Sequence, residues 1–255
     1  MTALQILHLY PQELGVFGDV GNVLALQRRS EWRGLDVTVS QHQVGAALPK
    51  AAPDIVVVGN GPHSGMRAVL GDLQQIAPAL REWVSAGAGL LAVSAGWQLL
   101  GQSLTIDGEA VPTAAVLPSV ATVSKRRFVS EIVAHSSRGL IMGFENHAAV
   151  TELVDGAQPL ATDIKRGYGN GVPEGAAVEG VLVGAAIGTN LGGPFLPLNP
   201  TWADYLLEQA VARRGEVLPA ITGEWAEIAD TYAEQARHGV ANAVPGAKGW
   251  LVAGA

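Results

Sequence analysis

Short apolar runs that alternate with helical patterns constrain the fold of this chain more than any other feature of its sequence. Residues 4–10, 35–40, 54–59 and 89–93 have the length of strands, and DIVVVG at 54–59 is apolar enough to be buried on both faces. Residues 21–33, 66–86 and 96–104 have apolar side chains at helical spacing. This alternation predicts an α/β fold in which helices wrap a mostly parallel sheet.

The pattern changes after residue 112. We expect shorter strands at 119–124, 128–134 and 140–144, a glycine-rich loop at 167–180, and a further strand at 180–188. Two helices are expected near the end: 202–214, with Trp202 on its apolar face, and 223–237, whose stripe around Trp225 should pack on the core. No linker separates these segments. Residues 1–214 are therefore expected to form one domain, with 215–255 as its C-terminal helical extension and tail.

Composition and charge exclude several classes of function. The net charge is −7 and the longest basic cluster is KRR at 125–127, which argues against a nucleic-acid partner. The first residues lack the pattern of a signal peptide, and no apolar stretch approaches the ~20 residues of a membrane span. The chain has no cysteine, which excludes disulfides, thiolate metal sites and thiol catalysis. We expect a cytoplasmic protein with no metal and no cofactor.

The segment LLAVSAGWQLLG at 90–101 has the layout of a nucleophile elbow, a sharp strand-to-helix turn. Such a turn holds one side chain at the end of a sheet. The residue at that position is Ser94.

Several segments, in order, resemble the class I glutamine amidotransferase domain of the cobyric-acid-synthase (CobB/CobQ) type, and its GatD branch in particular. They are LYPQELGVFGDVGNVLAL (9–26), VVGNGP (57–62), SAGWQLLG (94–101), GFENHAAVTEL (143–153), GYGNGVPEG (167–175) and GTNLGGPFLPLNPTWADYLL (188–207). The resemblance implies a three-layer α/β amidotransferase fold. In the GatD branch the protein pairs with MurT, a Mur-ligase-like enzyme, and together they amidate the glutamate of the peptidoglycan stem peptide on lipid II.

The catalytic dyad of that family is replaced at both matching positions. The family's elbow reads C-G-G-Y-Q-L-L-G, and its cysteine attacks the side-chain amide of glutamine. The base is a histidine in G-T-Y-L-H-G-P. This chain has Ser94 and Gly192 at those positions. We therefore expect no functional catalytic residue, no glutaminase activity, and a role as the partner of a MurT-like Mur ligase in a heteromer.

The neighbouring motifs of the site are altered as well. The family's loop G-G-G-Q-D, which supplies a backbone N–H to the oxyanion, reads Gly59-Asn60-Gly61-Pro62-His63 here. A side chain at Asn60 is expected to restrict close backbone approach. The remaining candidates for lining a ligand pocket are Arg127, Trp97, Gln98, His147 and Asn190.

Each candidate residue also has a simpler interpretation. Ser94 can be a buried or helix-capping serine, or a nucleophile if one of His63, His135 and His147 could serve as its base. Arg127 can bind a carboxylate or pair with Glu131. His147 is expected to be a hydrogen-bonded residue that anchors a loop.

Two functions of other classes stay open. One is a true enzyme, either an active glutamine amidotransferase or a Ser94-dependent hydrolase. The other is a free-standing protein that binds a small ligand in the old glutamine pocket.

Overall fold

The main sheet of the computed structural model, which describes residues 3–171 and 177–244, confirms the parallel α/β core. Its strand order is β10-β11-β4-β3-β1-β2, and only the edge strand β10 is antiparallel to its neighbour. The strands of this sheet are β1 (Leu4–Leu9), β2 (Val37–His42), β3 (Ile55–Val58), β4 (Gly89–Val93), β10 (Val181–Val183) and β11 (Ala186–Thr189).

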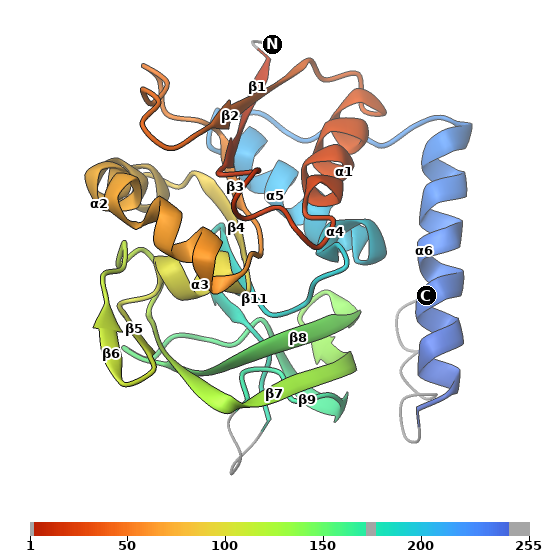
Figure 1. Cartoon of the computed structure of the whole chain (residues 1–255). Coiled ribbons are helices and arrows are strands. Elements are labelled where there is room, and N and C mark those ends of the chain that lie inside the picture. Colours follow the sequence, from red (N-terminus) through yellow and green to blue (C-terminus); the bar gives the residue numbers. More distant parts are fainter. Residues whose placement is uncertain (1–2, 172–176, 245–255) are drawn as a thin grey trace.

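Helices cover both faces of this sheet (Figure 1). α1 and α5 share one apolar core with the sheet, and α2 and α3 share the other. The Trp202 face of α5 is fully buried, as its periodicity predicts. The helices are α1 (Val20–Glu31), α2 (His63–Ser85), α3 (Ala95–Leu100), α4 (Phe195–Leu198), α5 (Pro200–Ala212) and α6 (Glu224–Asn242).

A second, five-stranded sheet lies beyond α3 and the carboxyl ends of the parallel strands (Figure 1). β7 and β8 form a long antiparallel hairpin in which the register shifts between Val123 and Phe128. The strands expected at 119–124 and 128–134 are thus one strand with a bulge, and the strand expected at 140–144 is the longer β8. The strands β5, β6 and β9 were not expected. The strands are β5 (Ser103–Ile106), β6 (Glu109–Val111), β7 (Ser119–Ser136), β8 (Gly139–Leu153) and β9 (Ala161–Arg166).

Two further expected elements are wrong in extent. The helix at 96–104 ends at Leu100, because Gly101 is extended and the chain turns into β5. A Cβ at Gly101 would lie 2.9 Å from the Ser119 carbonyl oxygen, so the close approach to β7 leaves no room for a side chain. The single strand at 180–188 is a hairpin, since Gly184 turns with a φ of +53°.

The prediction that the Trp225 stripe of the last helix packs on the core is wrong. Trp225 is 71% exposed and Tyr232 67% exposed, while the buried residues of α6 are Ala226, Ala233 and Ala241. Figure 1 shows α6 standing at the edge of the molecule, beside α1 and α4. Small alanines face the domain, so the large apolar side chains are left outside.

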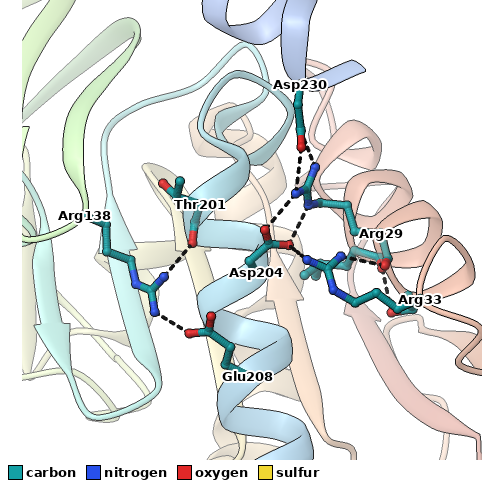
Figure 2. Close-up of polar contacts among 9 residues, drawn as sticks. Arg29, Arg33, Arg138, Thr201, Asp204, Glu208 and Asp230 are labelled. Carbon is teal, nitrogen blue, oxygen red and sulfur yellow. Dashed lines mark hydrogen bonds and ion pairs between the residues drawn. The ribbon is translucent and has the colours of Figure 1, made fainter. Parts of the chain in front are cut away.

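An ion-pair network fastens α6 to the domain (Figure 2). The buried guanidinium of Arg29 binds Asp204 of α5 through Nε and Nη2, both at 2.7 Å, and Asp230 of α6 through Nη1 at 2.5 Å. Arg33 also pairs with Asp204, at 2.7 Å. A further bond runs from Arg237 Nη1 to the Leu198 carbonyl, at 2.6 Å. Charged hydrogen bonds thus attach α6 to the domain, in addition to the packing of its small alanine side chains.

We expect Asp230→Ala to loosen α6 without unfolding the domain. The Asp230 side chain is 39% exposed, so its loss should cost only about 1 kcal/mol, equivalent to roughly fivefold more frequent opening of the helix. Limited proteolysis followed by mass spectrometry should therefore cut α6 faster in Asp230→Ala. Glu227→Ala is the control, since Glu227 lies on the same helix outside the network. Equal cleavage of the two variants would contradict the role of the network.

Candidate functional site

The strand-to-helix turn after β4 has the strained geometry of a nucleophile elbow. Ser94 has φ 48° and ψ −105°, a sparsely populated conformation for a residue with a side chain. A hydrogen bond holds this strained conformation: the Ser94 N–H donates to the Thr189 carbonyl at 2.8 Å. A Cβ at Gly96 would lie 2.7 Å from the Gly59 carbonyl oxygen, so only glycine allows α3 to approach β3 this closely. The elbow is intact although its apex is a serine.

Ser94 faces a pocket of about 1100 Å³ between the elbow, the glycine-rich loop after β3 and the β7–β8 hairpin. The pocket brings together most of the residues expected from sequence. Those that line it are Ser94, Asn60, Gly61, Gln98, Arg127 and His147.

Trp97 and Asn190 do not line this pocket, contrary to our expectation for them. Trp97 is fully buried against Gly188, where a Cβ would lie 2.6 Å from the indole ring, and its Nε1–H donates to Ser119 Oγ at 3.0 Å. Asn190 is 2% exposed, and its backbone N–H donates to Glu179 Oε1 at 2.8 Å. Both residues face the interior, because the indole of Trp97 fills the space left by Gly188 and the Asn190 side chain donates to the Gly169 carbonyl at 3.2 Å.

The backbone N–H groups around the elbow already have acceptors within the chain. The Ala95 N–H, directly after Ser94, donates to Asn60 Oδ1 at 3.3 Å. The Asn60 N–H donates to Asp19 Oδ2 at 2.9 Å. The sequence led us to expect only that the Asn60 side chain would restrict close approach to the backbone. In the structure this side chain also accepts a hydrogen bond within the site.

Two of the three candidate bases, His63 and His147, line the same pocket as Ser94, whereas His135 does not. Among the residues that the structure describes, the Ser94 hydroxyl forms no hydrogen bond to His63 or His147 and no capping bond to α3. His147 Nδ1 lies 2.9 Å from the Ala149 carbonyl and Nε2 lies 3.3 Å from Glu145 Oε2, so both nitrogens are engaged, and the residue is a buried anchor within β8.

Gly192 lies outside the pocket and pairs with Phe144. Its N–H donates to the Phe144 carbonyl at 2.9 Å, and the Phe144 N–H donates back at 3.2 Å. Among the described residues, a Cβ at Gly192 would meet only the Phe144 oxygen, at 3.5 Å, which is an ordinary contact. A Cβ could therefore be introduced here without displacing the backbone.

The bulge in β7 carries cationic side chains into the pocket. Lys125 and Arg127 line it, and Arg127 Nε donates to Asn146 Oδ1 at 2.8 Å. The alternative pairing of Arg127 with Glu131 is not formed, because Glu131 binds Arg166 at 2.8 Å. Sequence reasoning missed Lys125 and Asn146 as pocket residues. The only signals were the basic cluster at 125–127 and the position of Asn146 inside GFENH.

A buried acid lies behind the site. Glu179 is fully buried; its Oε1 accepts from Thr189 Oγ1 at 2.5 Å, and its Oε2 has no partner in the described structure. Burial raises the pKa of Glu179 to about 7 against these stabilising hydrogen bonds. Burial also raises the pKa of Asp19 to about 6. Sequence reasoning singled out neither carboxyl group.

We expect Glu179 to make the protein less stable as the pH rises from about 5 to 8. A carboxyl group whose pKa is higher in the folded state binds more protons there than in the unfolded state, so its contribution is lost above the folded pKa. For Glu179, whose pKa rises from 4.5 to about 7, the loss is on the order of 2–3 kcal/mol. Glu179→Gln should remove this part and leave two smaller, opposing contributions: a fall due to Asp19, and a rise due to His8, whose pKa burial lowers to about 4. Urea unfolding at pH 5 and pH 8 measures it, with exposed Glu152→Gln as control; an unchanged pH dependence in Glu179→Gln would contradict this assignment.

Within the described part of the chain, no group of three or more His, Asp or Glu side chains is placed to hold a metal ion. Over residues 3–171 and 177–244, no helix has the length and apolar character that crossing a membrane requires.

Comparison with known proteins places the fold and the elbow in a family. Residues 5–200 match the model of the CobB/CobQ-like glutamine amidotransferase domain. The chain belongs to this family. Among its relatives is the GatD subunit of the lipid II isoglutaminyl synthase (glutamine-hydrolyzing) of Staphylococcus aureus strain N315, 31% identical over 217 residues, which cover 84% of this chain and 87% of the relative. The corresponding subunit of Streptococcus pneumoniae strain R6 is 29% identical over 215 residues, or 83% of this chain and 82% of the relative. The chain is thus a GatD-like amidotransferase homologue.

Solved structures support the fold alone. One glutamine amidotransferase structure superposes with a TM-score of 0.54 at 18% identity and covers 80% of this chain and 98% of its own. A second, from Thermotoga maritima, has a TM-score of 0.52 at 14% identity and covers 93% and 94%. The expected amidotransferase fold is confirmed.

Proposed function

We propose that this chain is a GatD-like subunit without glutaminase activity, which acts in the cytoplasm as the partner of a MurT-like, ATP-dependent Mur ligase. The observation that carries the proposal is the state of the elbow. Its strained backbone is kept, while position 94 has a hydroxyl in place of a thiol and position 192 has no side chain at all.

The chemistry of the site supports this reading over hydrolysis. A serine hydroxyl attacks an amide only when a base takes its proton and N–H donors stabilise the oxyanion. Here Ser94 has neither His63 nor His147 as a hydrogen-bond partner, and the Ala95 N–H is bonded to Asn60. A Ser94-dependent hydrolase or an active amidotransferase is therefore disfavoured.

The relatives and the surface support the partner. Both relatives named above are subunits of a lipid II isoglutaminyl synthase. Trp225, Tyr232, Phe17 and Phe144 are each exposed by more than a third of their surface, and aromatic residues are common anchors of interfaces. The ligase would form an amide or peptide bond in peptidoglycan or a related specialised metabolite, with free ammonia or another amine as the nitrogen donor.

Co-expression with a Mur-ligase-like protein encoded beside this chain tests the proposal. The two should elute as one stable heteromer at micromolar concentration, and a tagged ligase should retain this chain through washing. An unrelated Mur ligase serves as the control and should not retain it. Separate elution of the two proteins would contradict the partner role.

A free-standing binding protein is the second candidate, and the pocket is the observation that favours it. A pocket of about 1100 Å³ with Lys125 and Arg127 on its wall can hold a small molecule that carries a carboxylate. Separate elution from the ligase, together with saturable binding of a small acid, would favour this function.

A further inference from the structure

The carboxamide oxygen of Asn60 accepts a hydrogen bond from the Ala95 N–H. In an amidotransferase or hydrolase with this turn, the N–H at that position would stabilise the oxyanion of the reaction. In a nucleophile elbow, the backbone N–H of the residue after the nucleophile forms part of the oxyanion hole. That residue is Ala95, and its N–H donates to Asn60 Oδ1 at 3.3 Å. The donor fixes the orientation of the amide, because an Nδ2 group at this point would face another N–H.

Hydrogen bonds to both the backbone N–H and the backbone carbonyl of Asn60 hold this residue in place. Its N–H donates to Asp19 Oδ2 at 2.9 Å, and its carbonyl accepts from the Val16 N–H at 3.2 Å. Asp19 is fully buried, and a Cβ at Gly59 would lie 2.6 Å from the Asp19 Cβ. The loop is thus tightly packed on Asp19, and Asn60 can leave the Ala95 N–H only by rotating its side chain.

From these contacts we infer that Asn60 is an internal occupant of the oxyanion hole, and that it sets what the pocket can bind. Its Oδ1 takes the position of a substrate carbonyl oxygen, and its own N–H already donates a hydrogen bond to Asp19. The cationic side chains of Lys125 and Arg127 still line the same pocket. The pocket therefore admits small acids at its cationic wall but excludes an amide or ketone oxygen from the elbow. This inference deepens the proposed loss of glutaminase activity and rests on it.

The absence of cysteine in the natural chain gives a clean test, because Ser94→Cys introduces a single thiol at the elbow. The probe is 6-diazo-5-oxo-L-norleucine, a glutamine-shaped diazoketone. The thiolate sulfur forms a bond to the diazo carbon, which takes a proton from water and loses N2, and the ketone oxygen lies at the Ala95 N–H during this step if that donor is free. Methyl methanethiosulfonate is the control reagent, since its reaction needs no oxyanion donor. Both rates are measured by mass spectrometry at pH 9, where an unassisted thiol is largely ionised.

We expect Asn60→Gly in the Ser94→Cys background to raise the rate of diazoketone labelling at least about tenfold, since it frees a donor of the oxyanion hole. Methanethiosulfonate labelling should change by less than about twofold, the range of small differences in access. Asn60→Asp keeps an acceptor at Oδ1 and should stay as slow as the Ser94→Cys parent. Equal diazoketone rates in all three proteins would overturn the inference.

A second measurement does not depend on the glycine variant folding. The Ala95 amide resonance of the natural chain should shift downfield in Asn60→Asp, because a carboxylate is the stronger acceptor. An unmoved resonance would overturn the inference. Both tests use the chain without a partner. Their failure would therefore leave the proposed partnership with a MurT-like ligase untouched. Glutamine hydrolysis by the natural chain would instead overturn the proposed function.

Discussion

Ser94→Cys alone is expected to leave glutamine hydrolysis at the level of a blank without protein. Restoring the thiol replaces only one member of a catalytic unit. Where nucleophile and base act together, loss of either costs about as much as loss of both, typically a factor on the order of 10³ or more. Position 192 would still lack an imidazole, and the Ala95 N–H would still donate to Asn60.

Stepwise reconstruction separates these causes. The backbone at Gly192 has room for a Cβ, which among the described residues would meet only the Phe144 oxygen, at 3.5 Å, so Gly192→His is the variant to combine with Ser94→Cys. The double variant Ser94→Cys/Gly192→His should gain at most a trace of activity, and adding Asn60→Gly should raise it further. Glutamate release is measured by a coupled dehydrogenase assay. Turnover of glutamine by Ser94→Cys alone, at a rate of roughly 1 s⁻¹ or more as is typical of enzymes, would contradict this account of the site.

The second large effect is expected on the partner. A MurT-like ligase produced without this chain should lose solubility or at least about tenfold of its activity, a difference of ~1.4 kcal/mol in the barrier or in the fraction of competent enzyme. Adding the purified chain should restore it. The Ser94→Ala variant of the chain should restore the ligase equally, because the role of this subunit does not require the Ser94 hydroxyl. A lone ligase with full activity would contradict this expectation and favour the free-standing binding protein.

The parallel core could be predicted because its signals are local. β3 is a short, fully apolar run buried on both faces, and the Trp202 face of α5 repeats at helical spacing. The elbow could be predicted as well, because the strand and the helix meet at a short glycine-containing turn. These features depend on residues close together in the sequence.

The parts that could not be predicted depend on contacts between distant segments. α6 has an apolar stripe, but Arg29 of α1 binds Asp230 and selects its alanine face, so Trp225 stays exposed. Trp97 looked like a pocket residue because it follows Ser94 closely, yet Gly188 of β11 leaves a space that the indole fills. The bond from Ala95 to Asn60 joins the start of α3 to the loop after β3, and no sequence pattern indicates it.

Glutamine hydrolysis by the natural chain in complex with its ligase tests the central claim most directly. The purified complex is supplied with ATP and the ligase's acceptor substrate, and with either glutamine or ammonium as the nitrogen source. We expect glutamate release from glutamine to equal that of the blank, while ammonium or another amine supports product formation. Glutamate release above the blank that Ser94→Ala abolishes would show a working glutaminase and contradict the account.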